Sequence, residues 1–427
     1  MSKSRAFRRA ALAAVIAGPL TAAMATNGYF SHGYGMKAKG MGGASVAMTD
    51  NAFAGANNPA IAAWAGNRVD LGLDLFMPSR EMSRTGSSGG AGFQDAAVKS
   101  DSNSFYIPEF GYNKAISDKL GVGITVYGNG GMNTDYAGGQ IAPNMCGAGA
   151  PASNVLCGQG RLGIDMTQLV VAPTIAYKVS DNHSFGVSPL IIQQQFKADG
   201  LQAFAAMSSD GSKLTGNGYD TSNGVGVRVG YLGKLNDKLS VGASYSPKIG
   251  MSKFSKYAGL FAEQGGFDIP ENYTLGAAFQ ATPDVTVALD YERINYGAIP
   301  SIANPSTSAG ALGAANGKGF GWSSINVWKL GVQWQATPAL TMRAGYNVGD
   351  NPIQSRDVTF NILAPGVTTT HYTLGGTYAL SKETEVTLAY MYAPSNSVSG
   401  ASFMAFGGTE TIKMSQQSLG VQVGWRF

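Results

Sequence analysis

Few residues in this chain of 427 have the types and the spacing that chemistry needs. Cys146 and Cys157 lie close together in a segment rich in glycine, alanine, proline and asparagine. In an exported protein such a pair is expected to form a disulfide that pins one loop. The three histidines, His32, His183 and His371, are scattered without a catalytic setting or metal-ligand spacing. The sequence therefore predicts no enzyme, no metal site and no cofactor.

The N-terminus predicts that the chain is exported. An apolar run extends from Ala10 to about Leu20, and Ala23-Met24-Ala25 has the small-x-small form of a cleavage site. This is the pattern of a secretory signal peptide, with an apolar part too short to span a bilayer. We expect residues 1–25 to be removed, so that the mature chain begins at Thr26. The basic residues lost with it are Lys3, Arg5, Arg8 and Arg9. The formal net charge of +4 disappears with them, and nothing else in the charge suggests nucleic acid as a partner.

The chain ends in a strand with one apolar face. Every second residue from Leu419 to Phe427 is apolar, and the residues between them are Gly420, Gln422, Gly424 and Arg426. Such alternation belongs to a strand with a hydrophobic surface on one side only. Similar segments recur from Asn67 onward, among them residues 120–126, 225–231, 239–245, 285–291, 330–334, 340–346 and 386–392. No later stretch reaches the roughly 18 apolar residues of a membrane helix, so we expect this surface to contact lipid around a β-barrel.

The connections between these segments predict the number of strands. Six are tight turns, near residues 116–119, 180–183, 235–238, 281–284, 336–339 and 380–383. Seven are long, near residues 79–102, 128–160, 197–218, 250–267, 297–321, 349–366 and 394–413. We therefore expect an all-β fold, a 14-stranded antiparallel transmembrane β-barrel over residues 67–427, with short periplasmic turns and long extracellular loops. A soluble β-helix or sandwich would not explain two classes of connection.

A barrel of this width leaves a lumen that the side chains of its wall need not fill. Residues 26–66 are rich in glycine, alanine and methionine and show no strand alternation. We expect this segment to form an N-terminal hatch inside the lumen. The alternative is a flexible tail in the periplasm.

Several motifs carry a resemblance to a known family. They are NGYFSHGYG at residues 27–35, KGMGGA at 39–44, NPA at 58–60, GNGGMNTDY at 128–136 and GLFAEQGGFDIP at 259–270. Over nearly the whole mature chain they resemble the FadL family, outer-membrane transporters of long-chain fatty acids and other hydrophobic compounds. The resemblance implies a fourteen-stranded barrel, a gating hatch that carries Asn58, Pro59 and Ala60, an apolar groove among the loops, and a break in the third strand that opens the wall sideways. Only Asp50 remains of two acidic residues that commonly precede Asn-Pro-Ala, which leaves open whether the substrate is a fatty acid or a smaller hydrocarbon.

Three sets of candidate site residues follow. Beyond the strand at residues 120–127, glycines weaken pairing and allow either a kink or bulge at a wall opening or an ordinary loop, and it is the resemblance that favours the opening. This set is Gly128, Asn129, Gly130 and Gly131. Apolar stripes at helical spacing in two long loops predict a ligand groove, unless the two loop helices merely pack on each other. This set is Leu201, Phe204, Met207, Phe254, Tyr257, Leu260 and Phe261. Strand parity points three cations inward, as carboxylate anchors or as lumen charges paired with each other or with the hatch. This set is Arg228, Lys329 and Arg343.

Sequence and resemblance together predict a passive channel of the bacterial outer membrane. Long-chain fatty acids are the first expected substrate, captured in the loop groove and released sideways into the bilayer. The alternatives are uptake of aromatic or alkane hydrocarbons by the same route, and a general diffusion porin; a surface adhesin or phage receptor is compatible with transport. The expected partners are a hydrophobic small-molecule ligand, outer-membrane lipid, and the barrel-assembly machinery through the C-terminal strand, with the protein as a monomer and no nucleic acid bound.

Overall fold

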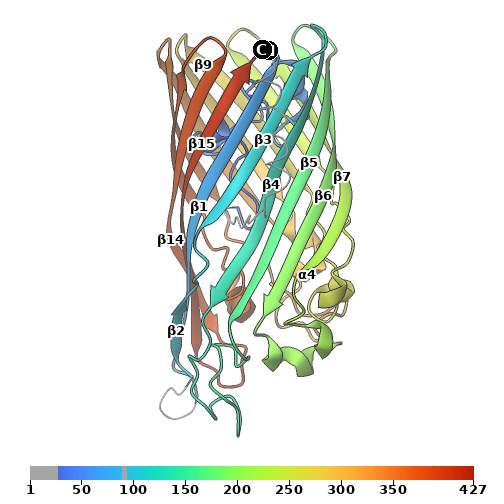
Figure 1. The fold of residues 1–427 in the computed structure, drawn as a ribbon, viewed down its shortest axis with the longest axis vertical. Coiled ribbons are helices and arrows are strands. Elements are labelled where there is room, and N and C mark those ends of the chain that lie inside the picture. Colours follow the sequence, from blue (N-terminus) through green and yellow to red (C-terminus); the bar gives the residue numbers. More distant parts are fainter. Residues whose placement is uncertain (1–26, 89–93) are drawn as a thin grey trace, which may run out of the picture.

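Antiparallel strands close a tall barrel around the N-terminal segment (Figure 1). The computed structural model describes residues 27–88 and 94–427. The predicted signal peptide, residues 1–25, and the cleavage point before Thr26 lie outside the described residues. No helix in the described parts of the chain is long and apolar enough to cross a bilayer.

The barrel has the fourteen strands expected from the alternating connections. They are β1 (Arg68–Thr85), β3 (Phe105–Ala115), β4 (Leu120–Tyr136), β5 (Leu162–Lys178), β6 (His183–Asp199), β7 (Asp220–Lys234), β8 (Leu239–Ser246), β9 (Asn272–Thr282), β10 (Val285–Ile294), β11 (Ile325–Thr337), β12 (Leu340–Gly349), β13 (Thr370–Ala379), β14 (Thr384–Ala401) and β15 (Thr409–Arg426). Each pairs with its neighbours in sequence, and β15 closes the barrel on β1 from Arg68–Arg426 to Thr85–Thr409. The short β2 (Ala96–Lys99) folds back on the end of β1 outside this ring.

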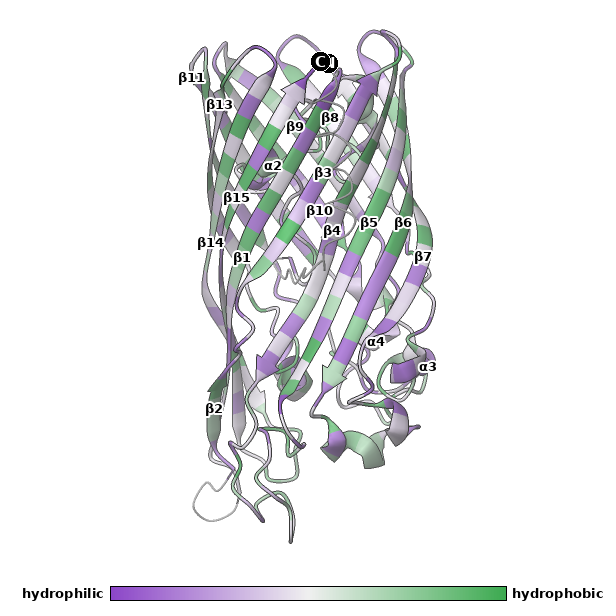
Figure 2. Ribbon diagram, in the orientation of Figure 1, coloured by the Kyte–Doolittle hydropathy of each residue, from purple (hydrophilic) through white to green (hydrophobic). Residues whose placement is uncertain are grey.

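The outer wall of the barrel is hydrophobic. Along β15, Leu419 is 52% exposed whereas Gln422, on the other face, is 1% exposed. Figure 2 shows the same alternation of hydrophobic and hydrophilic residues along most strands. Large apolar side chains point outward around the ring, among them Ile175, Ile191, Leu275, Leu289, Trp328, Leu374 and Leu388. Water-soluble monomers do not expose apolar surface on this scale, so the belt is a lipid-facing surface.

The two ends of the barrel differ. Short turns gather at the end that holds the C-terminus, and long loops with the small helices gather at the other (Figure 1). The loop helices are η2 (Gln202–Met207), η3 (Gly211–Lys213), η4 (Ser255–Tyr257), α3 (Ala262–Gly265), η5 (Tyr296–Ala298), α4 (Pro300–Ala303), η6 (Ser355–Asp357) and α5 (Val358–Asn361). In the loop between β4 and β5, a disulfide joins Cys146 and Cys157, whose Cα atoms are 5.5 Å apart.

The predicted helical stripe from Phe254 to Phe261 is not one helix. Only residues 255–257 form a 3-10 turn, and α3 begins after Phe261. Glu263 and Gln264 then adopt positive φ angles of 57° and 60°, which an α-helix does not allow. The spacing of the apolar residues is therefore produced by successive turns that bring their side chains to one side.

The segment before β1 fills the lumen near the short-turn end. Its regular elements are α2 (Met36–Lys39) and η1 (Pro59–Ala63), and the rest is turns. Most of its side chains, charged ones included, are buried against the inner wall. We call residues 27–66 the hatch.

Candidate functional site

The wall has an incomplete seam between β3 and β4. These strands pair only from Phe110–Val126 to Ala115–Gly121. Beyond Val126, β4 stays paired with β5 as far as Tyr136, and β3 stays paired with β1. The seam closes again where Ser100 bridges Tyr136. Within the described residues, the β4 edge from Tyr127 to Thr134 has no partner on β3; we call this stretch the window.

The kink or bulge predicted after Tyr127 is a bulge within a strand that continues beyond it. The sequence placed a loop after Tyr127, and this boundary was wrong, because β4 continues through the glycines to Tyr136. The register between β4 and β5 shifts between Gly128 and Gly130, which leaves Asn129 as the extra residue. A bulge bends its strand and disrupts the neighbouring ladder. It therefore accounts for β4 leaving β3 at this point.

The N-terminal tip of the hatch covers the window from inside. Phe30 bridges Gly130, and the amide of Gly131 donates to the carbonyl of Tyr29 over 3.1 Å. The amide of Ser31 donates to the carbonyl of Asn129 over 3.3 Å. We call residues 29–31 the strap, because they take the place of a missing strand partner.

Gly130 is needed for this contact. A Cβ atom at Gly130 would lie 1.8 Å from the carbonyl oxygen of Tyr29 and 2.8 Å from its carbonyl carbon. Real Cβ atoms do not approach backbone so closely, so any other residue here must displace the strap. Gly130 thus allows the hatch backbone to approach β4 closely. This role is additional to the weakened strand pairing that the sequence predicts.

The Asn-Pro-Ala triplet docks the hatch at a different place. The Asn58 side chain accepts from the amide of Ala60 over 3.0 Å and donates to the carbonyls of Val46 and Tyr231, each over 2.8 Å. Pro59 opens η1, where its missing amide costs nothing. A Cβ at Gly230 of β7 would lie 2.0 Å from the Asn58 side-chain oxygen. The triplet is therefore packed tightly on the wall, and it is the strap that touches the window.

Buried ion pairs hold the middle of the hatch. Lys39 of α2 lies 2.8 Å from Asp74 and 2.9 Å from Glu109, with all three side chains buried. Burial alone would lower the pKa of Lys39, but these two carboxylates outweigh it and raise the pKa above its usual value. Lys37 lies 2.8 Å from Glu385 of β14 and 3.3 Å from Asp50. These pairs fix α2 against the inner faces of several strands.

The three predicted anchor cations face inward, and each has a protein partner. Arg228 donates to the hatch carbonyls of Gly55, over 3.1 Å, and Ala56. Lys329 lies 2.9 Å from Glu292. Arg343 lies 3.3 Å from Asp50 of the hatch and also donates to Gln333 and Thr377. The arrangement matches the alternative in which these are lumen charges paired with the hatch or with each other.

The predicted groove residues lie together at the long-loop end, largely buried. The ring of Phe196 on β6 lies 5.6 Å from that of Phe254 and 4.6 Å from that of Phe261. Leu201, Phe204 and Tyr257 are buried in the same cluster, and Met207 and Leu260 pack at its edge. An apolar cavity of about 10 Å³ remains between the loops, which is at most the size of one water. The two loops therefore pack on each other and enclose a small apolar cavity.

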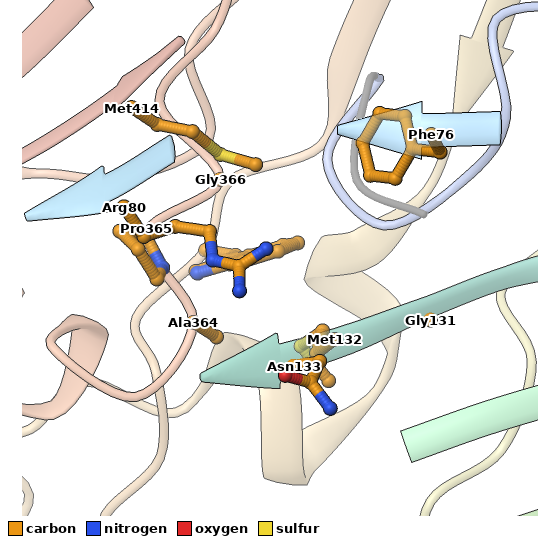
Figure 3. A pocket seen from close by; sticks show the side chains of 10 residues that line it. Phe76, Arg80, Gly131, Met132, Asn133, Ala364, Pro365, Gly366 and Met414 are labelled. Atoms are coloured by element: carbon orange, nitrogen blue, oxygen red, sulfur yellow. The ribbon is translucent and has the colours of Figure 1, made fainter. Parts of the chain in front are cut away.

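A second apolar cavity adjoins the window. Phe76 and Arg80 of β1, Gly131 and Met132 of β4, Trp322, residues 364–366 and Met414 surround about 20 Å³ (Figure 3). Sequence reasoning missed this cavity, because its wall is assembled from distant segments. Arg80 itself falls in the segment at residues 79–102 that the sequence predicts as a loop, whereas β1 continues to Thr85.

Comparison with known proteins agrees with this architecture. A family model described as outer membrane protein transport protein (OMPP1/FadL/TodX) matches residues 12–427. Among curated proteins, nothing matches the chain. The match covers almost the whole chain and so assigns the protein to outer-membrane transport rather than catalysis.

Solved structures share the fold at low sequence identity. The P. putida toluene transporter TodX has a TM-score of 0.67 and 19% identity, with 93% of this chain and 99% of that chain covered. A Pseudomonas aeruginosa FadL homologue has a TM-score of 0.68 and 14% identity over the same shares. The Ralstonia pickettii toluene transporter TbuX has a TM-score of 0.64 and 17% identity, again over 93% and 99%. The protein is an outer-membrane barrel and a member of the OMPP1/FadL/TodX family of outer membrane transport proteins.

Proposed function

We propose that this protein is a passive channel that admits hydrophobic small molecules at its long-loop end and releases them sideways through the window. The observation that carries the proposal is the β4 edge from Tyr127 to Thr134, which among the described residues has no partner on β3 and is bridged from the inside by the strap. Tyr34 and Leu363 make further contacts with this edge, through hydrogen bonds with Asn129 and Thr134. A sealed barrel would extend the β3–β4 ladder along both strands. An interrupted ladder backed by a removable segment is the arrangement that a lateral exit requires.

Capture begins in the apolar cluster of the long loops. Ligand that displaces its partly buried edge residues, Met207 and Leu260, leaves water and gains about 25 cal/mol for each Å² of apolar surface buried. The cavity beside the window continues the apolar route inside the barrel, with Met132 and Met414 as adaptable lining. Both cavities are smaller than any substrate, so side chains must move aside to admit it.

Release requires the strap to leave the window. The rest of the hatch is held by Lys39 and by Asn58, which lie outside the strap. Movement of residues 29–31 is therefore sufficient, and the remaining hatch continues to block aqueous flow. A long alkyl chain leaves toward lipid because it gains nothing by entering water.

Long-chain fatty acids are the first expected substrate, and aromatic hydrocarbons are the second. Two of the similar structures are toluene transporters, and a third is a FadL homologue. A general diffusion porin is disfavoured, because the hatch occupies the lumen and its charges pair with the wall. We expect outer-membrane lipid around the belt of a monomer and recognition of β15 by the barrel-assembly machinery.

Deletion of Asn129 tests the lateral route. The deletion restores a regular β4–β5 register and leaves the inward and outward faces of β4 unchanged. Uptake of dodecanol and toluene into a transporter-deficient strain should fall at least tenfold, while barrel yield and heat-modifiable migration stay normal. The matched control is deletion of Ala336, which occupies the register shift between β11 and β12 beside a short turn.

Two outcomes would contradict the proposal. Wild-type uptake by the Asn129 deletion would remove the lateral exit. Large, steady ion currents in planar bilayers would indicate an open porin instead of a hydrophobic channel.

A further inference from the structure

The inward face of β1 carries a row of arginines, and one of them lacks an acidic partner. Arg68 lies 2.8 Å from Asp70 and also pairs with Glu385. Arg84 lies 2.5 Å from Glu410. Arg80 is on the same face of the same strand, yet among the described residues no carboxylate lies within ion-pair distance of it.

The Arg80 side chain is almost completely buried, at 3% exposure. One guanidinium nitrogen donates to the Ser100 hydroxyl over 3.1 Å, and the group lies 5.6 Å from the centre of the Phe105 ring. The Nε atom is buried without any hydrogen-bond partner among the described residues. Guanidinium has five N–H donors, so most of them are without a partner in the part of the chain that the structure describes.

A buried cation without a counter-ion is costly to keep. A role in holding the barrel together would be served by a carboxylate partner, as at Arg68 and Arg84. The barrel instead leaves Arg80 with a weak neutral partner and an aromatic ring. Arg80 therefore offers donors to an anion that the described residues do not supply.

The residues around Arg80 indicate the chemistry of the rest of the bound molecule. Figure 3 shows the guanidinium of Arg80 extending from β1 into the cavity beside the window, across from Met132 on β4. Phe76, Met132, Trp322 and Met414 give the cavity an apolar wall. A molecule that fits here has one anionic group and an apolar body.

We propose that Arg80 binds the carboxylate of an amphipathic monocarboxylic acid whose apolar body occupies this cavity before it leaves through the window. A planar carboxylate accepts two parallel N–H bonds from a guanidinium, which matches the unused donors of Arg80. The inference rests on the proposed lateral route and narrows its substrate class to ionised acids. It also moves the anchor away from Arg228, Lys329 and Arg343, whose donors are already engaged.

Binding to the purified full-length barrel tests the proposal. Two matched pairs serve as probes: dodecanoate with dodecanol, and 4-methylbenzoate with toluene. Quenching of tryptophan fluorescence reports occupancy, because Trp322 lines the cavity. The variant is Arg80→Met, which keeps the length and apolar stem of the side chain. The control is Arg161→Met, which removes an arginine paired with Asp101 and Asp135 at an exposed site.

Arg80→Met should weaken binding of at least one acid roughly 10- to 100-fold and leave the uncharged partner of that acid within about twofold. Which acid responds distinguishes an aliphatic from an aromatic substrate. Arg80→Lys should keep part of the affinity for acid, since lysine supplies the positive charge but not the paired N–H donors of a planar guanidinium. The apparent melting temperature of the ligand-free Arg80→Met barrel should stay level or rise, because an unpaired buried charge is removed.

Unchanged affinity for both acids, or an equal loss for acids and their uncharged partners, would overturn the role of Arg80. Failure here with intact uptake of dodecanol and toluene would leave the lateral channel standing. Loss of the lateral channel is read separately, from the Asn129 deletion.

Discussion

Replacing Gly130 with alanine should detach the strap from the window. The added Cβ would lie 1.8 Å from the Tyr29 carbonyl oxygen and 3.3 Å from the Cα atom of Phe30. The obstacle is backbone rather than a flexible side-chain end, so the strap must move by more than 1 Å to reach ordinary contact. Alanine is too small to fill the window itself, which separates loss of the strap from blockage of the exit.

The expected cost follows from the hydrogen bonds that such a shift breaks. They are the bond from the Gly131 amide to Tyr29, at 3.1 Å, and the bond from the Ser31 amide to Asn129, at 3.3 Å. At about 1 kcal/mol each, docking of the strap loses about 2 kcal/mol, or about 30-fold in its equilibrium. Amide hydrogen exchange at residues 29–31 and at Gly131 should accelerate by about that factor. Uptake of dodecanol should rise if release of the strap limits transport.

The matched control is Gly376→Ala in β13. A Cβ there would lie 3.6 Å from the nearest neighbour, the sulfur of Met342, which is ordinary contact. Exchange at the strap should stay at the wild-type rate in this variant. Exchange at residues 29–31 that stays at the slow wild-type rate in Gly130→Ala would refute the reasoning. It would mean that docking of the strap does not depend on its close contact with Gly130.

Three further changes test how the hatch and one loop are held. Lys39→Met leaves Asp74 and Glu109 buried without their cation and should destabilise the docked hatch by about 3–5 kcal/mol, measured by denaturant titration of the folded barrel. The control is the triple variant that adds Asp74→Asn and Glu109→Gln, in which stability should recover. Unchanged stability of the Lys39→Met variant would contradict the ion-pair assignment. Burial, with His371, Lys39 and Lys329 nearby, lowers the pKa of His32 well below its usual value, so protonation opposes docking. Stability of the docked hatch should therefore be full above about pH 6.5 and decline below it, as measured by exchange at residues 27–35, and His32→Asn should flatten that pH profile. Replacing Cys146 and Cys157 with serine should cost about 2–3 kcal/mol of local loop stability, because the disulfide closes a sequence separation of only 11 residues, and should leave the unfolding temperature of the barrel within about 2 °C; a larger fall would mean that the loop supports the barrel.

The strands could be predicted because lipid imposes a rule on every one of them. Each must present apolar residues at alternate positions, as Leu419 and Val421 do. This pattern on the outer face does not depend on what the inner face contacts. The extent of β4 could not be predicted, because beyond Tyr127 its inner face contacts the hatch. The glycines there allow that contact and hide the apolar alternation of a strand. Pairing with β5 as far as Tyr136 continues the strand where its own sequence suggests a loop. Hydrogen bonds with Tyr29 and Ser31, about 100 positions earlier in the chain, add to it at Asn129 and Gly131.

The candidate site was harder to predict for a similar reason. The inward direction of Arg343 follows from strand parity, but its partner Asp50 is brought in by the fold of the hatch. Likewise the partner of Arg84 is Glu410, at the opposite end of the barrel sequence. Only once these distant partners are placed does Arg80 become distinctive, because its distinction is the lack of such a partner among the described residues.

The hydrogen-bonding needs of β4 limit how the gate can open. An unpaired strand edge facing hydrocarbon leaves amide and carbonyl groups unsatisfied, at several kcal/mol for each group. A large outward movement of the whole hatch would expose this edge and would also break the buried pairs of Lys39 and the three hydrogen bonds of the Asn58 side chain. Displacing residues 29–31 alone breaks two backbone bonds to the window and the bonds from the Tyr29 and Phe30 amides to the Tyr296 hydroxyl, and it leaves those anchors intact. We therefore propose that the N-terminal tip of the hatch moves as the gate, while the Asn-Pro-Ala triplet stays docked on the wall.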